Sequence, residues 1–155
     1  MKKSIPRLAL ALGTVLVAIM LFIGLGLNPK ALNGADYLER QQAMIRMLNV
    51  PMPLLGAATI LLTLISAALE RSNPKACLAL VTAAVLFAAA GFITRFYNQP
   101  INALVMTWRP ETIPIDWASW RDEWWRWHIA RTILAVAALA VFVIGYRRRA
   151  EVPTT

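Results

Sequence analysis

Four long stretches of the chain are almost free of charge, and their length limits the fold more than any other feature. They cover about residues 8–27, 50–69, 76–97 and 129–146. A helix needs about 20 consecutive apolar residues to cross the hydrocarbon core of a bilayer. None of these stretches has the length or punctuation of a strand. We therefore expect an all-α fold, a single four-helix transmembrane bundle whose two long loops are residues 28–49 and 98–128.

The composition favours a membrane protein over a soluble one. The chain has 155 residues, of which 59% are hydrophobic and 15% charged, against about 45–50% and about 25% in soluble domains. The net charge of +8 does not indicate nucleic acid binding, because the basic residues lie at the ends of apolar stretches rather than in one stripe. We therefore expect the lipid bilayer as the main partner and no nucleic acid. Nothing in the sequence predicts a homo-oligomer.

The first apolar stretch has a basic start, so a secretory signal peptide is an alternative interpretation. The hydrophobic part of such a peptide usually has only about 7–15 residues. The apolar stretch over residues 8–27 is longer, and no convincing small-x-small cleavage site follows it. We expect this segment to be retained as a transmembrane helix.

An even number of crossings places both termini on one side of the membrane and both long loops on the other. Lys and Arg are equally numerous on the two sides. On the side of the termini, however, they lie in much shorter segments that flank the spans directly, and such positions decide orientation. We therefore expect a multi-pass protein of a bacterial inner membrane with cytoplasmic termini.

The second loop is the most polar and aromatic part of the chain. It contains every tryptophan of the sequence, between Trp108 and Trp127, and a helix is expected to restart at Trp117. Side chains at spacings of three, four and three share one helical face. The spacing holds for Trp117, Trp120, Trp124 and Trp127. The plain explanation is a helix lying at the interface between membrane and water, where aromatic residues gather.

Several polar side chains are expected to converge where this loop meets the third and fourth apolar stretches. His128 and Arg131 lie three residues apart, and Trp124 and Arg121 precede His128 by four and seven. Side chains at these spacings lie on the same side of a helix. On the third stretch Arg95 and Asn98 have the same spacing of three, and Asn102 follows Pro100, which is expected to disturb that helix. We predict a pocket at this end of the bundle, with snorkelling of the arginines as the alternative.

The residue types in this predicted pocket favour proton and anion chemistry. A histidine titrates near neutral pH, and arginines hold anions or a developing oxyanion. The chain has one His and one Cys, which argues against a metal site. It also lacks a glycine-rich phosphate loop and a dinucleotide fingerprint. We therefore expect no metal and no cofactor.

Two motifs give the chain a resemblance to a known family. The first is Asn98-x-Pro100-x-Asn102, followed by Trp117-x(3)-Arg121-x(2)-Trp124-x(3)-His128-x(2)-Arg131 and an apolar stretch. The second is Gln41-Gln42-x-Met44-Ile-Arg-x-Leu-Asn49 in the first loop. Together they resemble the anthrone-oxygenase-like family of small four-helix membrane proteins. The resemblance implies oxidation of a flat phenolic substrate, such as an anthrone, by dioxygen without a cofactor.

The resemblance also implies roles for individual residues. His128 would be the base, while Arg131 and Arg95 would hold the substrate oxygen. A second set would contact the substrate rings: Asn98, Asn102, Gln42 and Trp124, with Arg121 and Asn49 on the same predicted faces. The alternative is a protein without enzymatic activity that uses the same pocket for a lipid, a quinone or a partner subunit.

Overall fold

The computed structural model describes residues 4–26 and 31–149, and this part of the chain is helical without strands. Residues 27–30, which include the end of the first predicted span and the start of the first loop, lie outside the described residues. The elements are α1 (Ser4–Gly26), α2 (Gly34–Leu48), α3 (Pro51–Leu69), α4 (Pro74–Ile93), the π-helix η2 (Thr94–Asn98), α5 (Gln99–Val105), the 3₁₀ turn η3 (Pro110–Thr112) and α6 (Trp117–Arg148).

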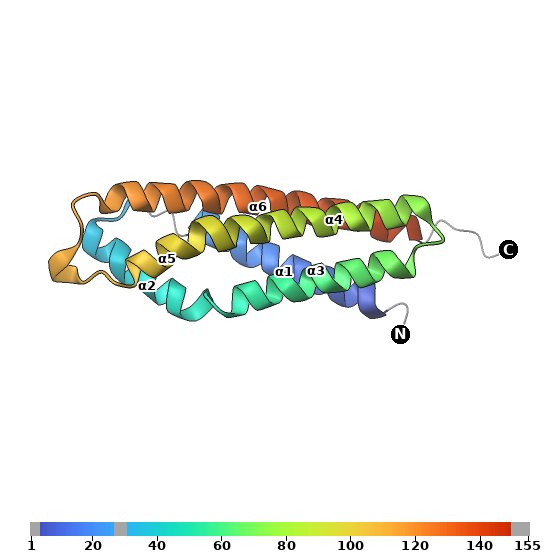
Figure 1. Ribbon diagram of the computed structural model, residues 1–155, viewed down its shortest axis with the longest axis horizontal. Coiled ribbons are helices and arrows are strands. Elements are labelled where there is room, and N and C mark those ends of the chain that lie inside the picture. The colour runs from blue at the N-terminus through green and yellow to red at the C-terminus, as the bar shows by residue number, and fades with distance from the viewer. Residues whose placement is uncertain (1–3, 27–30, 150–155) are drawn as a thin grey trace.

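Four helical stretches are long and apolar enough to cross a membrane, which confirms the predicted all-α class and shows a multi-pass membrane protein. They are Ser4–Leu25, Pro51–Leu69, Pro74–Val105 and Trp117–Arg148. The long helices pack mainly in a ring, α1 against α3 and α6, and α4 against α3 and α6. Both ends of the chain lie at one end of the bundle, while α2, α5 and η3 lie at the other end (Figure 1).

Small side chains let α4 and α6 approach each other closely. Ala83 and Ala138 are fully buried. A Cβ added to Gly145 would lie 3.1 Å from Ala79 Cβ and 3.1 Å from Leu80 Cγ. Lipid tails are as apolar as the side chains, so helices in a bilayer associate through such close packing rather than through the hydrophobic effect.

The turn between α3 and α4 fastens the end of the bundle that carries the termini. Asn73 accepts a hydrogen bond from Ala76 N at 3.2 Å, which caps the first turn of α4. Its side-chain amide donates to the carbonyl of Arg148 at 3.1 Å. Glu70 forms an ion pair with Arg149 at 2.6 Å. These contacts hold the end of α6 against the turn, so α3, α4 and α6 are fixed together at this end.

The third long helical stretch runs to Val105, beyond the predicted boundary at residue 97. Proline lacks a backbone N–H, and its ring clashes with the carbonyl of the preceding helical turn, so it normally breaks a helix. Here the turn before Pro100 widens into η2, in which Gln99 N donates to Thr94 O. Such π turns absorb an irregularity and often occur at functional sites. Part of the predicted loop 98–128 is therefore helical.

Helix α6 is longer than a bilayer is thick. Its 32 residues extend over about 48 Å at about 1.5 Å per residue, against about 30 Å for a hydrocarbon core. The helix expected to restart at Trp117 is therefore continuous with the fourth apolar stretch and does not lie along the membrane interface, which corrects that expectation. The excess length extends α6 beyond the hydrocarbon core.

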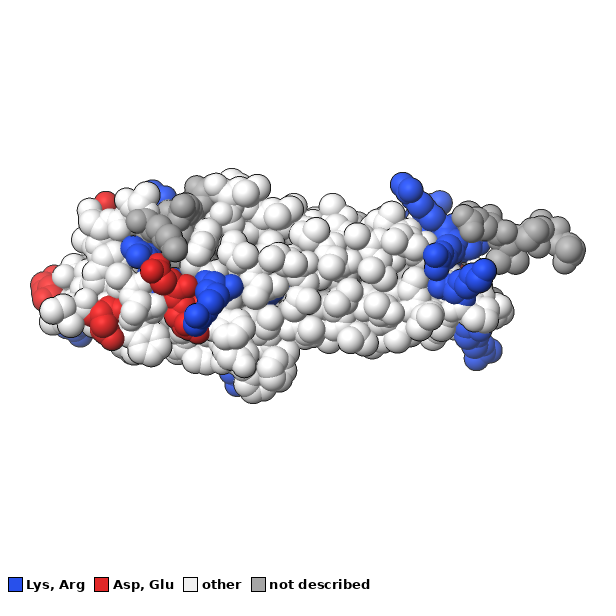
Figure 2. All heavy atoms as spheres, turned by 90° about the horizontal axis from the view of Figure 1, so that it is seen from above, with Lys and Arg blue, Asp and Glu red and all other residues white. Residues whose placement is uncertain are grey.

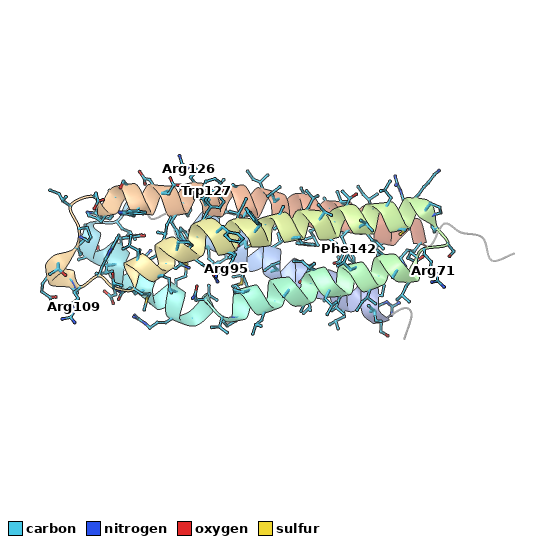
Figure 3. All side chains as sticks on the ribbon, in the orientation of Figure 1. Arg71, Arg95, Arg109, Arg126, Trp127 and Phe142 are labelled. Carbon is cyan, nitrogen blue, oxygen red and sulfur yellow. The ribbon has the colours of Figure 1, made fainter. Side chains whose placement is uncertain are left out.

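Charged residues gather at the two ends of the molecule and leave a wide uncharged band between them (Figure 2). The end that carries the termini is almost purely basic in this view, whereas acidic and basic residues mix at the other end. Arg71 and Arg109 mark these opposite ends (Figure 3). The uncharged band is what a protein surrounded by lipid requires.

Candidate functional site

A cavity of about 220 Å³ lies between the four long helices, near the level of η2. Helices α1 and α6 each contribute two residues to its lining. The rest of the lining comes from α3 and from the stretch α4–η2–α5. The lining residues are Leu16, Met20, Met52, Pro53, Gly56, Ala57, Ile60, Phe87, Ala90, Gly91, Thr94, Arg95, Gln99, Arg131 and Ala135.

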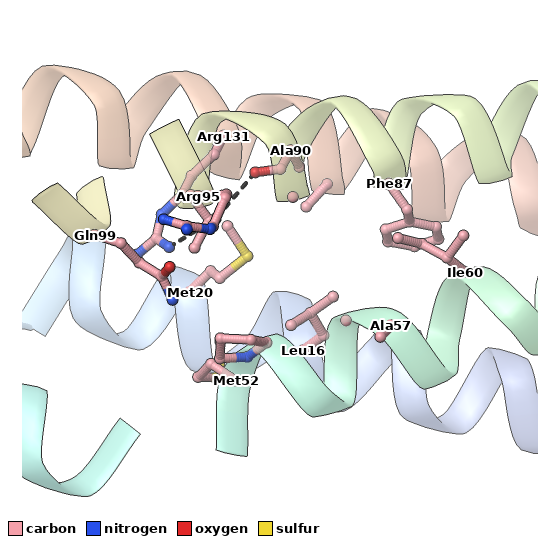
Figure 4. A pocket seen from close by; sticks show the side chains of 15 residues that line it. Leu16, Met20, Met52, Ala57, Ile60, Phe87, Ala90, Arg95, Gln99 and Arg131 are labelled. Atoms are coloured by element: carbon pink, nitrogen blue, oxygen red, sulfur yellow. Dashed lines mark hydrogen bonds between the residues drawn. The ribbon is translucent and has the colours of Figure 1, made fainter. Parts of the chain in front are cut away.

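The two ends of this cavity differ in polarity. Arg131, Arg95 and Gln99 lie together at one end, whereas Phe87 and Ile60 lie at the other (Figure 4). The remaining lining is almost entirely apolar. A ligand that fits this cavity needs an apolar body and a polar or anionic group at one end.

Arg131 carries a positive charge that is buried within a membrane-spanning helix. Its side chain is only 9% exposed, and none of the ion pairs found among the described residues includes it. Nη1 donates to Thr94 Oγ1 at 3.0 Å, Nη2 donates to His128 Nδ1 at 3.0 Å, and Nε has no partner there. A buried cation without an anion is costly in a membrane span. An anionic ligand in the cavity relieves that cost.

His128 lies behind Arg131 and does not line the cavity. The ring is fully buried and lies almost parallel to Trp124, with 5.1 Å between the centroids. A guanidinium only donates hydrogen bonds, so Nδ1 of His128 is the acceptor in the contact with Arg131. Nε2 then carries the proton and donates to Met20 O at 3.2 Å. His128 is therefore a neutral imidazole with both nitrogens engaged.

Thr94 and Gln99 belong to the cavity although the sequence did not single them out. Thr94 donates its hydroxyl to Ala90 O at 3.0 Å, which leaves its oxygen to accept from Arg131. Thr94 is the first residue of the wide turn η2 and Gln99 follows its last residue, so this turn sets the direction of both side chains. Pro100 was the only sequence signal near this turn, and a proline does not predict which way the side chains before it point.

Arg95 also lines the cavity, as the predicted meeting with Arg131 requires. It is exposed rather than buried, and its guanidinium lies 5.9 Å from the ring centroid of Phe96. Arg95 therefore lies at the rim of the cavity, whereas Arg131 lies inside it.

Three asparagines connect the helices beside the cavity. Buried Asn98 donates to Trp124 O at 3.0 Å. Asn102 accepts from Trp124 Nε1 at 2.8 Å and donates to Asn49 Oδ1 at 3.2 Å. Asn49, Asn102, Arg95 and Gln99 also line a shallow, open pocket of about 300 Å³ at the loop end. The structure thus places Asn98, Asn102 and Trp124 next to the cavity but uses their polar groups to join helices.

Two predicted site residues lie away from the cavity. Gln42 donates from Nε2 to Val105 O at 3.0 Å and to Trp108 O at 3.1 Å, which fastens α2 to the end of α5. Arg121 pairs with Asp122 at 2.9 Å and lies over the ring of Trp117. Within the described residues, no three His, Cys, Asp or Glu side chains gather in a metal-binding arrangement.

The fold and the cavity define a class: a multi-pass helical membrane protein with a buried arginine in an apolar, ligand-sized space. The family model described as anthrone oxygenase matches residues 41–141. The match runs from the middle of α2 through most of α6, and therefore covers all cavity-lining residues except the two from α1. The chain belongs to the anthrone oxygenase family, which confirms the resemblance found in its motifs. No curated protein and no solved structure matches the chain.

Proposed function

We propose that this protein is a membrane-bound oxidoreductase that oxidises a flat phenolic substrate with dioxygen in the central cavity. One observation carries the proposal: the buried guanidinium of Arg131 faces an apolar cavity and has no carboxylate partner among the described residues. A phenolate oxygen supplies the missing anion. The family to which the chain belongs supports the choice of an anthrone as the model substrate.

The size and shape of the cavity suit a compact planar ligand. Its volume of about 220 Å³ lies below the range of about 300–1,000 Å³ that is usual for drug-sized ligands. Rings would lie among Phe87, Ile60 and Leu16, and the oxygen would face Arg131 at the polar end. A bulky or branched substrate does not fit such a space.

The reaction is oxidation of the ring methylene to a carbonyl. Loss of one methylene proton to a water molecule gives an anion that is delocalised as an aromatic phenolate, and Arg131 stabilises the charge on its oxygen. This electron-rich anion reacts with dioxygen directly to give a peroxide anion. The peroxide takes a proton back from water, and loss of water from the resulting hydroperoxide leaves the quinone. One dioxygen is consumed per substrate, one of its oxygen atoms enters the quinone and the other leaves as water. The electrons come from the substrate.

The geometry favours a positioning role for His128 over direct proton abstraction. A base must reach the proton that it removes, and His128 is separated from the cavity by Arg131. Its Nδ1 lone pair becomes free only when Nη2 of Arg131 turns away to the substrate oxygen. In the arrangement described, His128 holds Arg131 towards the cavity as a neutral acceptor.

A direct test is oxygen uptake by the protein in lipid nanodiscs supplied with an anthrone. The expected result is one dioxygen consumed and one anthraquinone formed per anthrone, well above the rate of the protein-free blank. Arg131→Met removes the cation and should abolish the difference. Arg126→Met is the matched control, because exposed Arg126 pairs with Glu123 away from the cavity. Wild-type rates in Arg131→Met contradict the proposal, and binding without turnover indicates the non-enzymatic alternative.

We also propose that the termini face the cytoplasm of a bacterial cell. The basic surface at the end of the bundle that carries the termini supports this orientation (Figure 2), because Lys and Arg near span ends are retained on the cytoplasmic side. A C-terminal reporter that is active only outside the cytoplasm should give no signal. Activity of that reporter contradicts the orientation.

A further inference from the structure

We infer that the ligand enters the cavity sideways from the bilayer, through a seam between α3 and α4 that is flanked by Gly56 and Gly91. The inference rests on the proposed function only in taking the ligand to be a flat phenol. The seam would admit this ligand in its uncharged form from the hydrocarbon region. The substrate class is therefore a lipophilic phenol dissolved in the membrane.

The two glycines of the seam face open space. A Cβ added at either Gly56 or Gly91 would meet no atom within 4 Å, and both residues line the cavity. The buried glycines Gly13 and Gly145 are different. At Gly13 a Cβ would lie 3.3 Å from the ring of Phe87, and at Gly145 it would lie 3.1 Å from two side chains. Glycine at these two packed positions lets helices touch, whereas at the seam it leaves a gap.

The opening lies between two neighbouring helices. A short turn joins α3 and α4 at the end that carries the termini, and the two helices run alongside each other from there (Figure 1). The close-up in Figure 4 shows Ala57 on α3 at the lower side of the cavity and Arg131 at its upper side. Ala57 and Gly91 are both exposed although they line the cavity. The cavity therefore reaches the outer surface along this seam.

The surface around the seam is apolar apart from exposed Arg95, which lies four residues beyond Gly91. Gly56 and Gly91 both lie within membrane-spanning stretches. Leu61 on α3 is 58% exposed and Phe92 on α4 is 55% exposed, as side chains that contact lipid are. Transfer of an ion into hydrocarbon is far costlier than transfer of a neutral molecule. Lipid access therefore selects uncharged, lipophilic phenols, and Arg131 provides the polar contact only after entry.

The buried cation is the independent sign that a ligand occupies this space. Arg131 is nine-tenths buried, lines the cavity opposite the seam, and leaves Nε without a partner among the described residues. The competing route is the shallow pocket at the loop end, which Gln99 connects to the cavity because it lines both. That route would admit ligands from water.

The rates of ligand entry distinguish the two routes. The probe is alizarin, a flat dihydroxyanthraquinone, added in lipid vesicles at a pH at which the free dye is neutral. Binding is followed by quenching of tryptophan fluorescence, since the Arg131 guanidinium lies 5.9 Å from the ring of Trp124. Gly91→Phe and Gly56→Phe narrow the seam, Ala103→Phe narrows the loop-end pocket, and Val85→Phe adds the same ring elsewhere on the lipid-facing surface.

Narrowing the seam should slow association and dissociation in parallel by about tenfold, equivalent to a barrier higher by about 1.4 kcal/mol. Ala103→Phe and Val85→Phe should leave both rates unchanged. The inference is overturned if the seam variants keep the wild-type association rate, whether or not affinity changes. It is also overturned if Ala103→Phe alone slows entry. An unchanged unfolding temperature of each variant excludes a folding defect.

A reversible block provides the second measurement. In a Cys77→Ala background, Gly56→Cys and Gly91→Cys allow a reducible cross-linker to join α3 and α4 across the seam. Cross-linking should stop exchange of alizarin, and reduction should restore it. Exchange that continues while the cross-link is intact overturns the seam as the route. Failure of the oxygenase proposal looks different, because alizarin would still bind and exchange through the seam while an anthrone is not turned over.

Discussion

Arg131 donates from Nη2 to Nδ1 of His128 at 3.0 Å, and this contact joins the buried arginine and the buried histidine of α6 without a carboxylate. Because the guanidinium can only donate, the imidazole must be neutral and carry its proton on Nε2. The usual partner of a buried arginine is a carboxylate, which would neutralise it. A neutral acceptor holds the side chain in place and leaves its charge available to a ligand.

His128→Asn tests whether this residue acts as a positioning acceptor or as the base. The Oδ1 atom of an asparagine can occupy nearly the place of Nδ1 and accept from Arg131, but an amide does not take up a proton. We expect His128→Asn to keep a substantial part of the turnover and His128→Ala to lose most of it, about 100-fold for a misplaced group. The measurement is kcat and KM of both variants with an anthrone. Equal loss in the two variants favours the base role.

Glycine substitutions should separate close packing from open space. Gly145→Leu drives a branched side chain into Ala79 and Leu80, and overpacking of this kind costs about 1–3 kcal/mol. Gly91→Ala meets nothing within 4 Å, and it should be neutral or stabilising because alanine restricts the unfolded chain. Thermal unfolding in detergent measures both. Similar losses of stability in the two variants contradict the difference in packing.

The buried hydroxyl of Tyr37 should make the stability of the protein sensitive to alkaline pH. Burial raises the pKa of the Tyr37 hydroxyl well above its ordinary value, and the positive charge of Arg121 offsets only part of this shift. The folded protein retains this proton while the unfolded chain loses it near pH 10, so the stability contribution is present below that pH and is lost above it.

The variant Tyr37→Phe removes the titrating group. It should unfold at a similar denaturant concentration at pH 7, because the hydroxyl has no hydrogen-bond partner among the described residues. Above pH 10 it should lose less stability than the wild type. If the wild type and the variant lose stability equally above pH 10, other groups cause the alkaline effect.

A substitution of Gln42 tests whether this residue has a structural role or contacts the substrate. Gln42→Met leaves the carbonyls of Val105 and Trp108 without their donor, and a lost buried hydrogen-bond partner costs about 1–3 kcal/mol. We expect lower stability with an unchanged Kd for alizarin. Gln99→Met, which changes the cavity lining, should do the reverse. A weaker Kd in Gln42→Met with unchanged stability supports the substrate contact implied by the sequence motifs.

The apolar stretches predicted the helices because the requirement that acts on them is local. A span must be long enough and free of charge, and a single sequence shows both properties. The same reasoning predicted that Arg95 and Arg131 meet, because each lies near the loop-side end of neighbouring spans. Both side chains line the same cavity, where Arg131 is buried and Arg95 stays at the rim.

The details of the site depended on contacts between distant segments. Pro100 predicted a break in the helix, but the wide turn before it continues the helix and turns Thr94 and Gln99 towards the cavity. The family motif pointed to Gln42 without indicating that its partners are backbone carbonyls of α5 and the loop after it. Such partners appear only when the helices are packed.

The central claim is that Arg131 binds an anionic oxygen inside the cavity. The most direct measurement is the absorption spectrum of alizarin bound to the protein in nanodiscs, at a pH at which the free dye is neutral, because its colour changes on ionisation. The wild-type protein should shift bound dye to the anionic spectrum, whereas Arg131→Met should bind it neutral or not at all. An identical anionic spectrum and equal affinity in Arg131→Met would contradict the claim.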